Sequence, residues 1–269
     1  MTLEVTILGC GSSGGVPRAA QGWGKCDPDN PKNRRRRCSI LVTRREGPNS
    51  TVILVDTSPD LREQLIDAGV KRVDATLFTH SHADHTHGID DLRPLVIQNG
   101  RRVPAYMDEP TARALAQRFD YVFTTPPGSC YPPMMDARAL EAGKPVTIEG
   151  PGGPIEATPF RLEHGDMDSL GFRFEADGKV FAYTPDMNAI PPESVGCLAG
   201  LDLWIIDALR HQRHGTHFSV GEAFDWIARM KPRRAVLTDL HTDLDYAALA
   251  ASCPPATEPA YDGMRVALD

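Results

Sequence analysis

The six residues 80–85 hold the densest group of side chains in the chain that could do chemistry. Three of the nine histidines lie here together with one aspartate: His80, His82, Asp84 and His85. Imidazole nitrogens and carboxylate oxygens are the donors that zinc and similar divalent cations take in proteins. The apolar residues 75–78 come directly before this group and have the character of a buried strand. The sequence therefore predicts a metal site where this strand ends.

The pattern H-x-H-x-D-H after an apolar strand resembles the signature of the metallo-β-lactamase superfamily. This resemblance implies an α/β fold of the αββα sandwich type, with a metal centre at one edge of the sandwich. The chain contains no internal repeat and no linker-like stretch. We therefore expect residues 1–269 to form a single metallo-β-lactamase-like domain.

The resemblance also implies which residues hold two divalent metal ions. The first ion is expected at His80, His82 and His164, and the second at Asp84, His85 and His241. Asp186 is expected to bridge the two ions, and Asp56, which ends the predicted strand 51–55, is expected to steady the ligand loop from behind. Zinc or manganese suits these donors best, and iron is also compatible with them.

The last of these ligands departs from the common pattern. Related enzymes usually carry a histidine two residues after the last apolar strand position, but this chain has Asp239 there and His241 two residues later. Alternation along a strand would point both side chains to the same side. We favour His241 because imidazole is the expected donor, and we keep Asp239 as the alternative ligand or as a partner behind the ligands.

Within the superfamily, the chain resembles the phosphoribosyl 1,2-cyclic phosphate phosphodiesterase branch, which is akin to tRNase Z. The matching pieces extend over nearly the whole chain: residues 8–17, 23–26, 35–39 and 261–264, and His217. The resemblance implies a dinuclear hydrolase that cleaves a small cyclic or nucleotide-like phosphodiester through a hydroxide shared by the metals. His217, just before a predicted helix start, is placed to contact phosphate or to protonate the leaving group, so we expect the catalytic residues to be His217, Asp84 and Asp186.

Two other functions remain open. A lactone or thioester hydrolase of the same superfamily would use the same metal centre and would not need His217. A nucleotide- or metal-binding sensor on a decayed hydrolase scaffold is the non-enzymatic alternative, and Asp239 at the usual histidine position gives it some support. A tRNA-processing role is less favoured, because the chain lacks a long basic arm.

Strands and helices must position these residues. Apolar or alternating runs predict strands at 3–8, 39–43, 51–55, 75–79, 155–162, 171–174, 180–183, 203–206 and 235–238. Ser58 followed by Pro59 predicts the start of one helix, and the capping box from Ser219 to Glu222 predicts another. The aromatic and proline-rich segment 121–135 is expected to be a rigid surface loop, either a lid over the site or a packed connection.

Charge and composition limit which molecules the chain is expected to bind. The 29 basic and 36 acidic residues give a net charge of -7, which disfavours a grip on long nucleic acid. The run Arg34–Arg37 is expected to be a solvated face from which one or two side chains could reach an anionic substrate. No apolar run is long enough to span a bilayer, and six scattered cysteines fit a reducing compartment. We therefore expect a cytoplasmic protein with a small phosphodiester substrate and no membrane partner, and we keep a homodimer as one candidate assembly.

Overall fold

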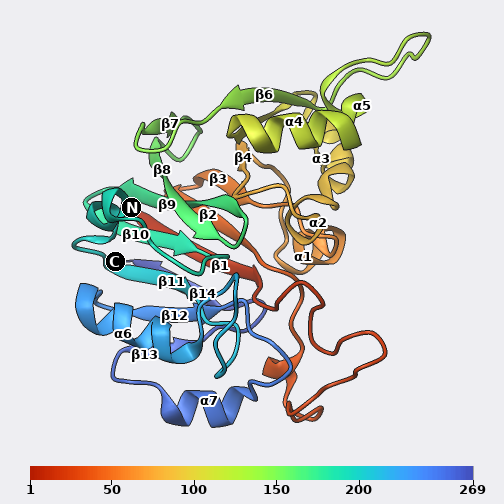
Figure 1. Ribbon diagram of the computed structural model, residues 1–269. Coiled ribbons are helices and arrows are strands. Elements are labelled where there is room, and N and C mark those ends of the chain that lie inside the picture. Colours follow the sequence, from red (N-terminus) through yellow and green to blue (C-terminus); the bar gives the residue numbers. More distant parts are fainter. Residues whose placement is uncertain (269) are drawn as a thin grey trace.

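The computed structural model describes residues 1–268, in which two seven-stranded sheets pack face to face (Figure 1). The first sheet has the order β14-β1-β2-β3-β4-β5-β6 and the second β13-β12-β11-β10-β9-β8-β7. The strands of the first sheet are β1 (Thr2–Gly9), β2 (Ser39–Glu46), β3 (Asn49–Val55), β4 (Ala75–Leu77), β5 (Val103–Met107), β6 (Met135–Ala139) and β14 (Arg265–Leu268). Those of the second are β7 (Val146–Ile148), β8 (Ile155–His164), β9 (Met167–Ala176), β10 (Lys179–Thr184), β11 (Leu203–Asp207), β12 (Ala235–Thr238) and β13 (Thr257–Pro259).

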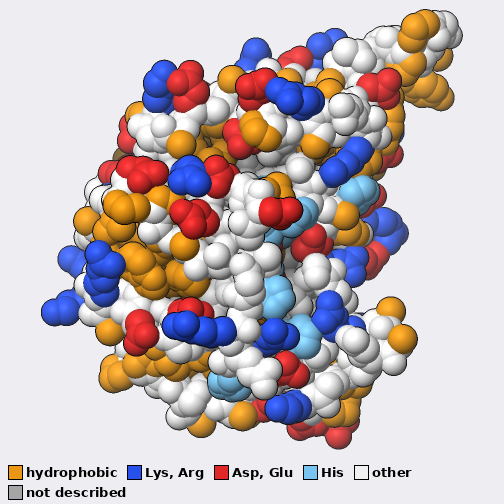
Figure 2. Space-filling view, viewed as in Figure 1, with side chains coloured by type: hydrophobic (Ala, Val, Ile, Leu, Met, Phe, Trp, Pro, Cys, Tyr) orange, Lys and Arg blue, Asp and Glu red, His pale blue; other side chains and the backbone are white. Residues whose placement is uncertain are grey.

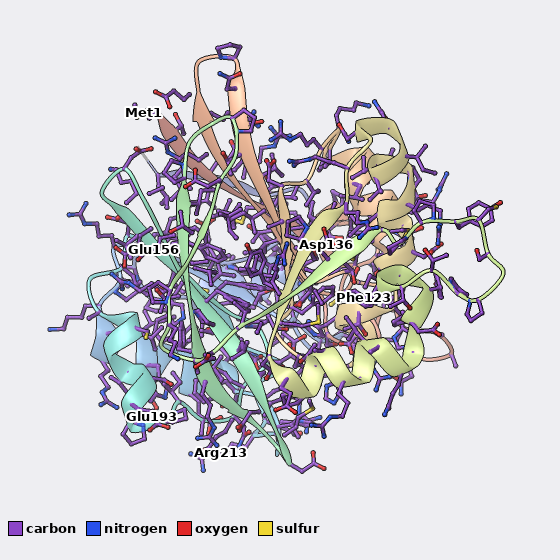
Figure 3. The ribbon with its side chains drawn as sticks, turned by 90° about the horizontal axis from the view of Figure 1, so that it is seen from above. Met1, Phe123, Asp136, Glu156, Glu193 and Arg213 are labelled. Atoms are coloured by element: carbon purple, nitrogen blue, oxygen red, sulfur yellow. The ribbon has the colours of Figure 1, made fainter. Side chains whose placement is uncertain are left out.

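Helices lie outside the two sheets, so the layers run helix, sheet, sheet, helix (Figures 1 and 3). The helices on the side of the first sheet are α1 (Leu61–Asp67), α2 (Ala83–Thr86), α3 (Arg93–Asn99), α4 (Glu109–Arg118) and α5 (Asp120–Phe123). Those beside the second sheet are α6 (Val220–Met230) and α7 (Tyr246–Ser252). Short 3-10 turns occupy Pro31–Asn33, Ile89–Leu92 and Pro192–Leu198. The αββα sandwich expected from the sequence is confirmed.

Strand alternation divides the buried apolar side chains into three layers. The central layer lies between the sheets and takes every second residue of a strand, as Leu3, Val5 and Ile7 of β1 show. A second layer joins the outer face of the second sheet to α6 through residues such as Trp204 and Ile227. A third joins the outer face of the first sheet to α1, α4 and α5. Each sheet is therefore buried on both faces, which holds its strand ends rigidly.

The predicted strands are all present, mostly one to three residues longer than the sequence indicated. The capping box is confirmed, since the Ser219 hydroxyl accepts from the Glu222 N–H and the Glu222 carboxylate accepts from the Ser219 N–H. The predicted helix start at Ser58 is wrong. The helix α1 begins at Leu61, because the Ser58 carbonyl first closes a turn by accepting from the Leu61 N–H. The strands β5, β6, β7, β13 and β14 were not predicted.

The segment expected to be a rigid loop contains the short helix α5 and then runs without regular structure to β6. Figure 1 shows this segment projecting away from both sheets beyond α5. It therefore extends outward rather than folding back over the sandwich. None of the helices in residues 1–268 combines the length and the apolar character that crossing a bilayer requires.

The arginine run is mostly occupied with internal contacts. Arg35 is only 2% exposed, and its guanidinium donates to the carbonyl oxygens of Leu244, at 2.8 Å, and His241, at 3.3 Å. Arg36 and Arg37 form ion pairs with Asp67 and Asp60. The expectation that the whole run is a solvated face is therefore wrong, because one arginine instead joins the N-terminal loops to the segment after β12.

We predict that Arg35→Met lowers the free energy of unfolding by about 2–4 kcal/mol, because the substitution leaves buried carbonyl groups without their charged donor. The matched variant Arg34→Met removes an exposed guanidinium and should cost less than about 0.5 kcal/mol. Urea unfolding followed by circular dichroism measures both. Equal midpoints for the two variants would contradict this role of Arg35.

Candidate metal centre

The predicted site residues lie at the carboxyl ends of strands from both sheets. In the first sheet, β3 and β4 are parallel and are followed by Asp56 and by the segment 80–85. In the second sheet, β10, β11 and β12 are parallel, and Asp186, Asp207 and Asp239 stand at or just beyond their ends. Carboxyl ends of parallel strands meet at one edge of a sheet, and such edges are where open α/β sheets bind ligands.

Close backbone pairing holds the segment 80–85 against the end of β3. The Thr57 N–H donates to the His85 carbonyl at 2.8 Å, and the Gly88 N–H donates to the Thr57 carbonyl at 2.9 Å. A Cβ atom at Gly88 would lie 1.9 Å from the Ser58 carbonyl oxygen, so only glycine permits this approach. The pairing brings His85 next to Asp56.

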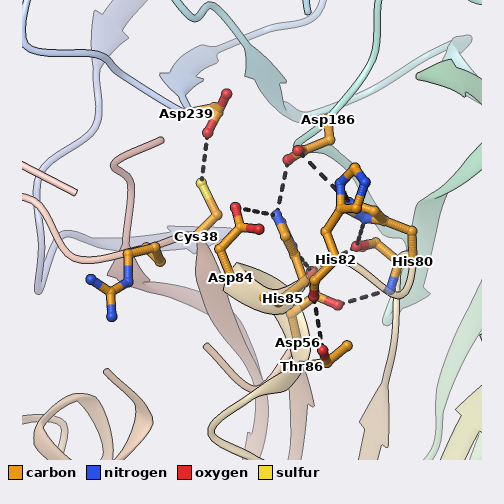
Figure 4. Close-up of polar contacts among 12 residues, drawn as sticks. Cys38, Asp56, His80, His82, Asp84, His85, Thr86, Asp186 and Asp239 are labelled. Atoms are coloured by element: carbon orange, nitrogen blue, oxygen red, sulfur yellow. Dashed lines mark hydrogen bonds and ion pairs between the residues drawn. The ribbon is translucent and has the colours of Figure 1, made fainter. Parts of the chain in front are cut away.

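The first group of converging side chains consists of three imidazoles and one carboxylate: His80, His82, His164 and Asp186. His82 Nδ1 lies 2.9 Å from His80 Nε2 and 3.3 Å from His164 Nε2 (Figure 4 shows His80 and His82). The other nitrogen of His164 lies 2.7 Å from the Thr216 carbonyl, to which it donates, so Nε2 keeps its lone pair. Asp186 lies 3.6 Å from His164 Nε2. Nitrogen atoms of three rings thus face one point.

The second group consists of Asp84, His85 and Asp186. Asp56 accepts a hydrogen bond from His85 Nδ1 at 2.7 Å, and it also accepts from the N–H and the hydroxyl of Thr79, both at 2.8 Å. His85 Nε2 therefore faces Asp186 Oδ1 at 3.2 Å and Asp84 Oδ2 at 3.5 Å (Figure 4). Asp186 belongs to both groups.

The third group consists of Asp186, His217 and Asp239. His217 Nδ1 lies 3.0 Å from Asp207 Oδ2, to which it donates, and 3.0 Å from Asp239 Oδ2. The opposite nitrogen, Nε2, lies 3.9 Å from Asp186 Oδ2. The Asp207 carboxylate also accepts from the Met187 N–H at 3.0 Å, so its position is fixed by the backbone.

His241 lies apart from these groups. Its Nε2 accepts from the Arg18 guanidinium at 2.6 Å, and its Nδ1 lies 3.3 Å from the Asp243 carboxylate. The structure therefore brings Asp239, and not His241, next to Asp186. The alternation argument does not extend this far, because β12 ends at Thr238 and Asp239 takes a left-handed conformation with φ 60°.

Charge and burial shift the pKa values of these groups in opposite directions. Burial lowers the pKa of the His80 imidazole well below its ordinary value. Burial acts the same way on His85, but the Asp186, Asp84 and Asp56 carboxylates outweigh it and raise the pKa of His85 well above its ordinary value. Burial is outweighed at His217 too, where Asp207 and Asp239 raise the pKa to about 12. The carboxylates therefore favour positive charge at His85 and His217, whereas burial disfavours it at His80.

Unpaired buried atoms give independent support for divalent cations at this cluster. Among the described residues, three buried atoms of the cluster have no hydrogen-bond partner: His85 Nε2, Asp186 Oδ1 and Asp239 Oδ2. Buried polar atoms are normally paired, because an unpaired one costs about 1–3 kcal/mol. Ring nitrogens and carboxylate oxygens that face one another without a shared hydrogen are suited to share a cation. The cluster is thus able to bind metal ions.

Two polar residues of this region were not singled out from the sequence. Asp207 ends an apolar strand, as Asp56 does in relation to β3, and that shared position is the signal that could have found it. Arg18 carries no such signal, since it reaches His241 from a loop distant in sequence.

Comparisons with known proteins agree with this architecture. A family model described as "Beta-lactamase superfamily domain" matches residues 51–239. A solved structure of a diphosphatase from the PhnP family is 32% identical, with a TM-score of 0.85, and the match covers 100% of this chain and 98% of that one. The zinc-bound PqqB of Methylobacterium extorquens is 20% identical, with a TM-score of 0.74 and coverage of 98% and 99%, which shows the shared fold alone.

A curated relative differs in length. An octanoyltransferase of Porphyromonas gingivalis is 31% identical over 272 residues, which are 99% of this chain and 52% of the relative. The chain therefore spans about half the length of that relative. The family match, the sandwich of two sheets and the histidine–aspartate cluster at its edge lead to one conclusion: the chain belongs to the metallo-β-lactamase superfamily of hydrolases, within its PhnP family.

Proposed function

We propose that the chain is a dinuclear metal-dependent phosphodiesterase that hydrolyses a small cyclic or nucleotide-like phosphodiester. The observation that carries this proposal is the place of Asp186, which belongs to all three groups of possible ligands. One carboxylate shared between neighbouring groups suits two adjacent cations. His80, His82 and His164 would hold the first ion, Asp84, His85 and Asp239 the second, and Asp186 would join them.

The bound ions, whether zinc, manganese or iron, would polarise the phosphoryl oxygens and lower the pKa of a water molecule at the site. The chain's own residues would do the rest. Asp186, Asp84 and His85 would fix where the attacking water and the phosphate meet. His82 is the exposed member of the cluster, so substrate would enter on its side.

His217 is placed to act on the leaving group. Its Nδ1 hydrogen is committed to Asp207, so Nε2 is directed towards Asp186. The Asp207 and Asp239 carboxylates raise the pKa of His217, which favours the protonated ring. His217 would therefore hydrogen-bond a phosphate oxygen or donate a proton to the departing alkoxide.

Basic side chains near His217 and His241 support an anionic substrate over a lactone. His214 lies beside His217, with ring centroids 5.4 Å apart, and Arg18 contacts His241. Arg210 Nε is buried without a hydrogen-bond partner among residues 1–268. Figure 2 shows histidine and basic side chains lying together on this face of the molecule. A neutral lactone or thioester would gain little from such charge.

Further expectations about the setting are part of this proposal. With a net charge of -7, the chain suits a small substrate better than long nucleic acid. Within residues 1–268 all six cysteines are free, which fits a reducing compartment such as the cytoplasm.

We predict that Asp56→Asn weakens metal binding by about 10–100-fold, because the amide no longer holds His85 in the orientation that exposes Nε2. Competition with a chromogenic chelator measures this affinity. Asp74→Asn is the matched control, since Asp74 is equally buried but precedes β4 and pairs with Arg72 and Arg101. An unchanged affinity in Asp56→Asn would contradict the support role of Asp56.

We predict that His217→Ala lowers kcat/KM for a ribose cyclic phosphate by about 10²–10⁴-fold, because a poor leaving group needs a proton donor. The loss should be much smaller for bis(p-nitrophenyl) phosphate, whose leaving group departs unaided, and the bound metal should be unchanged. His82→Ala, by contrast, should lower bound metal and turnover of every substrate. Rapid lactone hydrolysis that survives His217→Ala, without phosphodiester turnover, would favour the lactonase alternative.

We predict that Arg18→Leu raises KM by about 10-fold for a cyclic ribose phosphate that carries a second phosphate, because one charge-assisted hydrogen bond is lost. The same variant should leave KM for bis(p-nitrophenyl) phosphate within about twofold, since that substrate has no second anionic group. Steady-state kinetics on the two substrates, with Arg34→Leu as the control, give the comparison. A uniform effect on both substrates would show that Arg18 only supports the loop.

A further inference from the structure

We propose that the two metal positions take different ions, zinc at the first and manganese at the second, and that Asp239 creates the difference. This inference rests on the two-metal centre of the proposed function. It goes further by assigning an ion to each position from the donors of this chain.

The first position is rich in nitrogen. His80, His82 and His164 converge there with one carboxylate, Asp186. Imidazole is a donor of intermediate softness, and three imidazoles with one carboxylate are a favourable set for zinc. A small, oxygen-preferring cation such as manganese gains less from such a set.

The second position is rich in oxygen. Asp84 and Asp186 lie 3.5 and 3.2 Å from His85 Nε2, so two carboxylates and one imidazole face one point. Asp239 stands in the neighbouring group that shares Asp186. With Asp239 the donors are three carboxylates and one imidazole, a set that suits manganese far better than the first position does.

Asp239 has an oxygen free for this purpose. His217 Nδ1 lies 3.0 Å from both Asp207 and Asp239, but its single hydrogen goes to Asp207. Among the described residues, Asp239 Oδ2 therefore has no hydrogen-bond partner, although the side chain is only 2% exposed. A buried carboxylate oxygen without a hydrogen-bond partner is costly, and a cation bound there, beside the His217 ring at 3.0 Å, would reduce that cost.

His241 does not compete for this position. The Leu240 N–H donates to the Cys10 carbonyl at 2.8 Å, and the His241 N–H donates to the Leu209 carbonyl at 3.0 Å. Leu240 itself is fully buried in the layer beneath α6 and α7. These contacts fix the register of the segment and keep the His241 ring against Arg18 rather than near Asp186.

The test is a metal competition on the purified full chain after chelation. The protein is equilibrated with one equivalent of Zn²⁺ and an excess of Mn²⁺, and bound metals are counted by elemental analysis and by Mn²⁺ electron paramagnetic resonance. We expect one zinc and one manganese per chain. We also expect the preference for zinc over manganese, taken as the ratio of dissociation constants, to be about 100-fold smaller at the second position than at the first.

Asp239→His should remove the difference, because the second position then gains an imidazole. We expect its preference for zinc to rise at least about 10-fold and the manganese signal to fall. Asp239→Asn, which keeps the size of the side chain, should lower manganese affinity at least about 10-fold. This variant replaces Asp239→His as the test if Asp239→His does not fold. His241→Asn is the control and should leave both dissociation constants unchanged.

The outcomes separate this inference from the proposed function. Two equally zinc-selective positions, or Asp239 variants that match the wild type, would overturn the assignment of manganese while leaving a dinuclear phosphodiesterase intact. Altered metal binding in His241→Asn, with none in Asp239→His, would overturn it as well. One zinc and one manganese bound without turnover of any phosphodiester would support this inference and reject the proposed function.

Discussion

The collection of buried carboxylates at one edge of the sandwich is the constraint on which the rest of the structure depends. Asp186, Asp207 and Asp239 are each less than a twentieth exposed, and Asp84 is 17% exposed. Four negative charges so close together, out of water, would cost several kcal/mol each without compensation. Three kinds of group offset this cost at the edge: the imidazoles, the backbone N–H groups that donate to Asp207, and the proposed cations.

Both sheets place an aspartate at this edge with the same backbone conformation. Asp56 follows β3 directly and Asp239 follows β12 directly, and both take left-handed backbone conformations, with φ 62° and φ 60°. Aspartate tolerates this conformation better than most residues, although it still carries a cost. Each turn sends the chain away from its sheet just where the carboxylate is needed. The burial of both faces of each sheet supplies the rigidity that keeps these two turns in place.

What the sequence predicts well is local. The cluster 80–85 is contiguous, so its donors meet whatever the remainder of the chain does, and the structure places His164 and Asp186 against it as their order in the chain suggested. Strand alternation could not decide whether Asp239 or His241 lies near Asp186, because the strand ends one residue before Asp239. Arg18 and Asp207 act through contacts across the fold, which no local pattern encodes.

The same reasoning explains the errors in secondary structure. Ser58 and Pro59 match the usual pattern of a helix start. The Ser58 hydroxyl contacts the Asp60 N–H and the Gln64 side chain, however, and the helix begins only at Leu61. The missed strands β7 and β13 are only three residues long and lie at sheet edges, where one neighbour rather than a hydrophobic pattern defines them.

Net charge and local charge also differ in this protein, and the difference decides how a substrate anion would arrive. The whole chain is acidic, yet His214 lies beside His217 of the cluster, and Arg18 and Arg210 lie near His241. At physiological ionic strength, charges more than about 8–10 Å away are largely screened. An anion at the mouth of the site would therefore respond to these nearby side chains and to the metal ions rather than to the distant acidic surface. An acidic protein can thus select an anionic substrate, provided that its basic groups stand next to the reacting centre.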